Sequence, residues 1–194
     1  MNTPARPYRQ RARAESASGN TERILTAALE LFVERPFEQV TLAAVAERAG
    51  VGLQTVIRRV GTKDGLVEAV GAWVAPQVAA DLGAPPGPDP DLVAAAFRRH
   101  YSRWALLLER NLAQEDSSPA LKANAEGGRV AHRGWLAAAF PGLDPRTFSR
   151  LVGVTGVELW LVLTKHEGLS VEDAEATVAL LIRSVISADK GQPS

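Results

Sequence analysis

The stretch VTLAAVAERAGVGLQTVIRRVGTKDGL, residues 40–66, has the pattern of two short helices joined by a tight turn. Thr41 is placed to cap the first helix, and Gly50 stands at its stop position. A second helix of similar length is predicted from Leu53 to Val60. Two short helices joined through the Gly-Val-Gly sequence at residues 50–52 have the spacing of a helix-turn-helix unit.

The second of these helices has one apolar face and one polar face. Val56 and Val60 lie four residues apart and form the inner face. The outer face carries hydrogen-bonding groups and positive charge, which are the side chains that a helix needs to read the DNA major groove. A plain three-helix packing unit without DNA binding is the alternative interpretation. The candidate base-contacting residues are Leu53, Gln54, Thr55, Arg58 and Arg59.

A longer helix before this unit should supply the surface on which it packs, because helices of about eight residues are unstable alone. Thr21 can cap that helix, and Ile24 and Phe32 lie on its apolar face. Pro36 marks its end. Residues 1–20 are polar, Arg-rich and without apolar periodicity, so we expect them to form a disordered basic tail.

Helical periodicity continues after the helix-turn-helix unit. Thr62 can cap a helix that begins at Lys63, and Pro76 is expected to kink that helix or end it early. The sequence GAPPGPDP at residues 83–90 predicts a linker. Further helices are predicted over residues 91–114, from Pro119 for a short stretch, around residues 132–140, over residues 151–165 and over residues 171–186.

No strand is predicted, so the expected fold class is all-α. The expected domains are a helix-turn-helix DNA-binding domain over residues 21–66 and a second helical domain over residues 67–190, for which the candidate ligand-binding and dimerisation residues are given below. Residues 1–63 carry ten Lys and Arg against six Asp and Glu, whereas the remainder carries 12 against 16. A basic first third suits an anionic partner for that part alone.

Composition excludes several kinds of site. The chain has no cysteine, which excludes disulfides, thiolate zinc sites and cysteine catalysis. Its three histidines fall on three different predicted helices, so no metal site and no cofactor are expected. The longest apolar stretch, Leu151–Leu163, has 13 residues, whereas a membrane-spanning helix needs about 20. We therefore expect a cytoplasmic protein that does not contact a membrane.

Residues 21–70, and above all residues 40–66, closely resemble the N-terminal domain of TetR-family transcriptional regulators. The resemblance implies a homodimer, palindromic operator DNA, and a helical C-terminal domain that binds a small-molecule effector. It assigns phosphate contacts to Thr41 and Lys63, and groove-facing positions to Leu53 and the polar residues of the same helix. One position departs from the family, because Ile57 stands where a tyrosine is usual. A phosphate-contacting hydroxyl is therefore missing, which weakens or alters DNA binding unless Arg58 and Arg59 compensate.

The second part of the chain offers apolar helix faces with isolated polar members. Mostly apolar walls with a few directed polar groups suit a small apolar or aromatic ligand. Each of these residues also has the ordinary interpretation of a hydrogen-bonded or packed core residue. The candidate ligand-binding residues are His100, Trp104, His132, Trp135, Glu158 and Trp160.

The last two predicted helices carry more apolar surface than one domain core can cover. Residues 151–165 are apolar on nearly every side, and residues 171–186 follow a near-heptad pattern. Gly153 and Gly156 would allow close approach of a partner helix. We expect a four-helix dimer interface that contains Leu151, Val154, Leu159, Val178, Leu181, Ile182 and Val185.

The sequence therefore favours a ligand-responsive transcriptional regulator, most simply a repressor, that is not an enzyme. An all-helical small-molecule carrier or enzyme is the alternative from another class, although no nucleophile–base pair supports catalysis. An activator of the same family is the nearer alternative, and DNA binding alone does not distinguish it from a repressor.

Overall fold

The computed structural model describes the backbone of residues 6–189 and the side chains of residues 18–188. In this part of the chain every regular element is helical, as expected. The helices are α1 (Arg6–Glu34), α2 (Leu42–Ala49), α3 (Leu53–Val60), α4 (Lys63–Leu82), α5 (Pro90–Ala113), α6 (Pro119–Ala139), α7 (Pro145–Val154), α8 (Val157–Leu161) and α9 (Val171–Asp189). Two 3₁₀ turns, η1 (Phe37–Gln39) and η2 (Glu115–Ser117), and a π-helical turn, η3 (Val162–His166), connect them.

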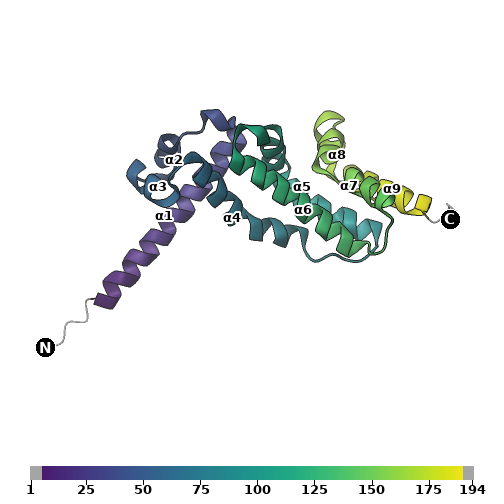
Figure 1. The fold of residues 1–194 in the computed structure, drawn as a ribbon, viewed down its shortest axis with the longest axis horizontal. Helices are drawn as coiled ribbons and strands as arrows, with labels where there is room; N and C mark the ends of the chain where they lie inside the picture. The colour runs from purple at the N-terminus through teal and green to yellow at the C-terminus, as the bar shows by residue number, and fades with distance from the viewer. Residues whose placement is uncertain (1–5, 190–194) are drawn as a thin grey trace.

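The helices form two cores that share α5. Helices α1–α3 gather at one end of the molecule and α7–α9 at the other, with α4, α5 and α6 between them (Figure 1). The first core contains Ile24, Leu31, Val45 and Val56, and reaches Trp104 of α5. The second is formed by α5–α9. Helix α4 crosses the domain boundary expected at residue 66 and packs on both parts.

The first helix begins earlier than expected. Helix α1 starts at Arg6, so residues 6–20 are helical and Thr21 lies inside the helix instead of capping it. Residues 8–18 contain three alanines, three arginines, Gln10 and Glu15, which are good helix formers, so a helix packed at its C-terminal half can propagate through them. Residues 1–5 of the expected tail, and the side chains of Arg6–Arg13, lie outside the described part.

Helix α4 does not end at Pro76 but continues to Leu82. The proline ring removes one backbone hydrogen bond, to the carbonyl of Ala72. Both residues are exposed, so water can satisfy that carbonyl. Helix α6 is likewise longer than expected, because the short helix from Pro119 and the stretch to Ala139 form one helix that runs through Gly127 and Gly128.

The apolar segment from Leu151 to Lys165 is not one helix. The chain leaves helical geometry at Thr155 and Gly156, which separate α7 from α8. The break is supported from α5, where the Tyr101 hydroxyl donates to the Thr155 carbonyl oxygen at 2.7 Å. Burial against other elements therefore satisfies a backbone group that a helix would have bonded internally.

Three of the expected dimer residues face the protomer's own core. Leu151, Val178 and Ile182 are buried between α5, α7 and α9. They are therefore not available to a partner, because the near-heptad stripe of α9 is used within the protomer. Val154, Leu159, Leu181 and Val185 remain only half-buried.

Candidate nucleic-acid interface and cavity

The helix-turn-helix unit has the bounds that the sequence predicts. The Thr41 hydroxyl accepts a hydrogen bond from the backbone N–H of Ala44 at 3.1 Å and so caps α2. Gly50 ends α2 with φ +63°, a left-handed conformation that favours glycine. Helix α3 then begins at Leu53.

Helix α3 presents its polar side to solvent. Val56 is fully buried against the core, and Val60 is half-buried. On the opposite side Gln54, Arg58 and Arg59 are exposed, and Thr55 is half-buried. Leu53 and Ile57 are 41% and 38% exposed, one turn apart. The exposed face is therefore the one that the sequence assigned to DNA, with two apolar side chains beside its polar groups.

The start of α4 is held tightly against the end of α3. The Thr62 hydroxyl accepts from the backbone N–H of Gly65 at 3.0 Å. A Cβ atom at Gly65 would lie 2.1 Å from the Val60 carbonyl oxygen, so only glycine allows this approach. The arrangement exposes the positive N-terminal end of α4 beside α3, a natural place for a phosphate.

Lys63 is the first residue of α4. Its Nζ atom lies 3.9 Å from the centroid of the Phe37 ring, a cation–π contact. Burial lowers the Lys63 pKa, and the nearby carboxylates of Glu38 and Asp64 oppose that shift. The ammonium is thus partly desolvated and held in place at the edge of the exposed face.

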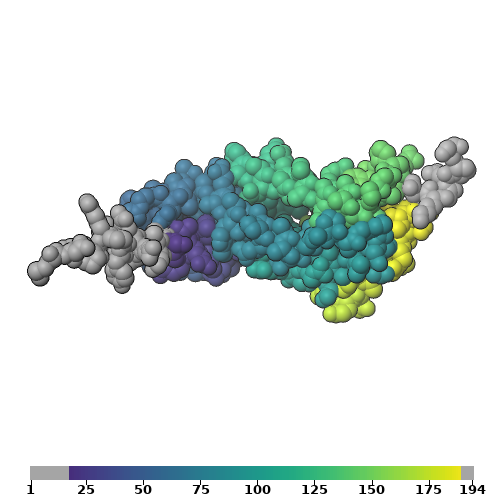
Figure 2. All heavy atoms as spheres, turned by 90° about the horizontal axis from the view of Figure 1, so that it is seen from below, coloured from purple at the N-terminus to yellow at the C-terminus, as the bar shows by residue number. Residues whose placement is uncertain are grey.

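A cavity of about 580 Å³ lies behind this face, between α4, α5 and α6. Figure 2 shows an opening between the green surface of α6 and the teal surface of α4 and α5. Small residues leave this space where the helices face one another, and the cavity is lined by Gly71, Ala72, Ala75 and Ala79 from α4 and by Ala123, Gly127, Gly128 and Ala131 from α6.

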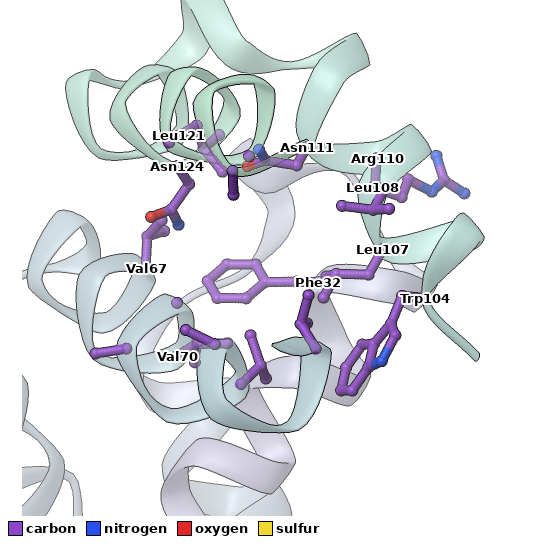
Figure 3. Close-up of a pocket in the computed structure, with 18 of the residues that line it drawn as sticks. Phe32, Val67, Val70, Trp104, Leu107, Leu108, Arg110, Asn111, Leu121 and Asn124 are labelled. Carbon is purple, nitrogen blue, oxygen red and sulfur yellow. The ribbon is translucent and has the colours of Figure 1, made fainter. Parts of the chain in front are cut away.

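The cavity walls are mainly apolar. Phe32, Val70 and Leu121 are among the apolar lining residues (Figure 3). Asn111 and Asn124 supply amide groups on the side opposite Val70 (Figure 3). No acidic residue lines the cavity in the described part of the chain. Such walls can hold an apolar molecule with a hydrogen-bonding group.

Of the expected ligand-binding residues, only the tryptophans of α5 and α6 line this cavity. Trp104 donates its indole N–H to Asp81 at 2.7 Å, and Trp135 donates to the Gly83 carbonyl oxygen at 2.8 Å. His100, His132 and Trp160 lie in or against the second core, and Glu158 is exposed. Sequence reasoning missed the two asparagines, although single amides on otherwise apolar helix faces were a readable signal.

His100 is buried and His132 is half-buried, and His132 contacts the helix break at Thr155. Burial lowers the pKa of His100 to about 4, partly opposed by Asp81. Burial also lowers the pKa of His132 to about 4, helped by His100 and Arg133. Both rings are therefore neutral at pH 7. The Thr155 hydroxyl donates to the Leu151 carbonyl oxygen at 2.8 Å and lies 3.0 Å from His132 Nε2, so this nitrogen is the donor.

Among the described residues, no group of three or more His, Asp or Glu side chains is arranged to hold a metal ion.

Residues 24–70 match the family model described as bacterial regulatory proteins of the tetR family. This part of the chain is therefore similar to the N-terminal domain of tetR-family regulators. TetR-family proteins are transcriptional regulators, typically ligand-responsive DNA-binding repressors, and not enzymes. The matched residues include α2, α3 and the beginning of α4, which form the exposed face described above.

Solved structures with the same fold extend the TetR-like architecture over most of the chain. A transcriptional regulator from Rhodococcus sp. RHA1 is 22% identical, with a TM-score of 0.72 over 89% of this chain and 99% of its own. A TetR transcriptional regulator from the same organism is 23% identical, with a TM-score of 0.53 over 86% and 94% of the two chains. No curated protein matches the sequence.

A third similar structure is the multidrug binding protein EbrR complexed with imidazole. It is 23% identical, with a TM-score of 0.61 over 82% of this chain and 88% of its own.

Proposed function

We propose that this tetR-family regulator represses transcription by binding palindromic operator DNA as a homodimer, and that a small apolar effector releases it. The position of α4 carries this proposal. Its first residue, Lys63, stands beside the exposed face of α3, and Val67, Val70 and Val74 further along line the cavity. One rigid helix therefore joins the two sites, so a ligand that favours another position of α4 would also change the DNA-binding face.

A homodimer accounts for apolar surface that the protomer leaves uncovered. In the described part of the chain, Pro145–His166 is the one segment whose length and composition would suit a membrane span, and it is 28% buried. The turn at Thr155 and Gly156 interrupts it; Val162 within it is exposed, as is Leu180 of α9. Pairing with a second copy would bury this surface, whereas no lipid contact is needed to explain it.

The expected effector is neutral, mainly apolar, and carries one or two hydrogen-bonding groups. A cation would find no carboxylate on the described cavity walls. Asn111 and Asn124 can each donate and accept, so they suit a carbonyl, hydroxyl or amide group. Arg110 is exposed at the edge and is the nearest counter-charge for an anionic end.

Substitutions at the DNA-binding face should fall into two classes. Lys63→Ala should weaken binding to all sequences and lower the salt dependence by about one unit per half-site, because Lys63 would neutralise a phosphate. Arg58→Ala or Gln54→Ala should instead relax preference at one symmetric pair of positions, by about 1–3 kcal/mol per lost bidentate contact. Binding-site selection from a random DNA pool, followed by titrations at several salt concentrations, measures both effects.

Thr41 should behave like Lys63, since its position suits a phosphate contact, whereas Leu53 should contribute to base preference through a thymine methyl. The reading face would be wrong if Gln54→Ala, Arg58→Ala and Arg59→Ala all left the selected sequence unchanged. Repression itself would be refuted if deleting the gene lowered expression from promoters that contain the selected sequence.

Filling the cavity should weaken ligand binding without unfolding the protein. Ala131 is exposed on α6 and lines the cavity, so Ala131→Trp should place an indole in the ligand's space. The neutral fluorescent probe N-phenyl-1-naphthylamine should bind the wild type and lose about tenfold or more in affinity. Ala137→Trp is the matched control, because Ala137 is exposed on the same helix but does not line the cavity. Equal probe binding by both variants would place the ligand elsewhere.

A further inference from the structure

Phe37 lies between the cavity and the lysine at the start of α4. Its side chain lines the cavity, together with Val67 and Leu121. The face of the same ring carries the Lys63 ammonium, 3.9 Å from the ring centroid. A molecule in the cavity and the cation at the DNA-binding face would therefore share one aromatic side chain.

The backbone of Phe37 is also tied to a cavity wall. Its N–H donates to the Gln114 side-chain oxygen at 2.5 Å, across 77 residues of sequence, and Gln114 lines the cavity from the end of α5. A second tie runs beside it, from the Ser118 hydroxyl to the Asp64 carboxylate at 2.6 Å. Ser118 caps α6, and Asp64 directly follows Lys63. A movement of α5 would therefore be transmitted to Phe37, which contacts Lys63, and a movement of α6 would be transmitted to Asp64, which follows Lys63 in the sequence.

The contact with the Phe37 ring lowers the cost of binding a phosphate at Lys63. A flexible lysine normally loses side-chain entropy and hydration when it binds DNA. Here the ring already restricts the ammonium and removes part of its water, in agreement with the direction of its pKa shift. Because a cation–π contact uses one side of the ammonium, donors on the other side stay available for a phosphate oxygen.

We propose that Phe37 is a positioning residue that holds Lys63 for its phosphate contact and passes the state of the cavity to it. This inference rests on the proposed function, since it assumes that Lys63 contacts operator phosphate and that the cavity binds the effector. A ligand that displaces the Phe37 ring would release Lys63 and so weaken operator binding. This route from the cavity to Lys63 runs through Phe37 and is separate from a movement of α4 as a whole.

Phe37→Leu tests the positioning role in the full-length protein. Leucine keeps an apolar side chain but lacks the aromatic face. Operator affinity, measured on DNA from binding-site selection, should fall about 5- to 30-fold for a dimer that uses the contact twice. The double variant Phe37→Leu/Lys63→Ala should bind no more weakly than Lys63→Ala alone, because both changes remove the same contact. Additive losses would overturn the positioning role.

Phe32→Leu is the matched control. Phe32 lines the same cavity and its ring stacks on Phe37, with centroids 6.3 Å apart, but the cation lies over the Phe37 ring. The control should keep operator affinity and salt dependence within about twofold of the wild type. Thermal unfolding of both variants confirms that they are folded. An equal loss of operator affinity in the control would overturn the special role of Phe37.

The coupling to the cavity can be observed directly at Lys63. The chain has four lysines, so ¹³C-lysine labelling gives few signals, and Lys63→Arg assigns the one of interest. The Phe37 ring current should move the Lys63 ε-methylene signal upfield in the wild type and in Phe32→Leu, but not in Phe37→Leu. Saturation with N-phenyl-1-naphthylamine should return the wild-type signal toward that of Phe37→Leu. A bound probe that leaves the Lys63 signal unchanged would overturn the coupling.

These outcomes differ from a failure of the proposed function. A wild-type protein that selects no operator refutes the repressor assignment, and a probe whose binding ignores Ala131→Trp refutes the cavity as its site. In either case the inference about Phe37 also fails, because it assumes both operator binding and a ligand in this cavity. With both premises standing, additivity with Lys63→Ala or an unmoved Lys63 signal refutes the Phe37 inference alone.

Discussion

Leu181→Glu should convert the proposed dimer into monomers and weaken operator binding by about 100-fold or more. Leu181 is half-buried on α9 and is not among the residues packed against the second core. A glutamate there can stay hydrated in the monomer, but in a dimer it would be buried without a partner. A monomer contacts only one half-site and loses the gain from linking two recognition helices, which is typically 10²–10⁴-fold.

Light scattering at micromolar concentration and operator titration together test this expectation. Leu106→Glu is the matched control, because Leu106 is 55% exposed on α5 and the proposed interface does not include it. The control should remain dimeric and bind operator normally. A wild-type monomer, or a Leu181→Glu dimer that binds operator with unchanged affinity, would contradict the proposed interface.

The helix-turn-helix unit could be predicted to the residue because its signals are local. Two threonines, Thr41 and Thr62, cap the helices that follow them, and Gly50 ends α2. The spacing of Val56 and Val60 determines the inner face of α3. Each signal acts within one or two helical turns. The structure confirms the bounds of α2 and α3 and the first residue of α4 for that reason. The exposed side of α3 followed from the same periodicity.

The departures arise where tertiary contacts outweigh local preference. The break at Thr155 is stabilised by Tyr101, which is 54 residues away in sequence. Its hydrogen bond satisfies a carbonyl that sequence periodicity would assign to a continuous helix. Likewise, the apolar stripe of α9 was readable, but whether Val178 and Ile182 face a partner or the protomer's own core depends on how α5 and α7 pack.

The sequence pointed to only two of the residues that line the cavity, Trp104 and Trp135, because a cavity is defined by the space left between helices. The prediction centred on aromatic and histidine side chains, yet His100 is buried and His132 half-buried near the second core. The space itself comes from glycines and alanines that face one another on α4 and α6. A sequence shows that such residues are small, but it does not show that two small faces meet.

Trp104→Ala should lower the free energy of unfolding by about 3–5 kcal/mol, the usual cost of removing a buried tryptophan side chain. Trp104 belongs to α5, yet it is 4% exposed within the first core, beside Val70 and Val74 of α4. Its indole N–H bonds Asp81, and Arg103 lies over its ring with the guanidinium carbon 4.6 Å from the centroid. The substitution removes all these contacts together.

Urea unfolding of the full-length protein measures the loss, and two variants separate its causes. Trp104→Phe keeps one aromatic ring but removes the five-membered ring of the indole together with its N–H donor, so it should cost clearly less than Trp104→Ala. Trp135→Ala removes a tryptophan from the same cavity wall, but Trp135 is half-buried, so its loss should be smaller than that of Trp104→Ala. Equal losses in the two alanine variants would show that burial does not control the effect.

The helices in which Trp104→Ala raises amide hydrogen exchange show whether the two cores unfold together or separately. Because Trp104 joins α5 to the core that contains α1 and α4, its removal should raise amide hydrogen exchange most in α1–α4. Helices α7–α9 should stay protected, since their core is built on other residues of α5. If exchange rose equally in α7–α9, the two cores would unfold as one unit. Trp104 would then be a general stability residue and not the specific link between the cavity wall and the DNA-binding domain.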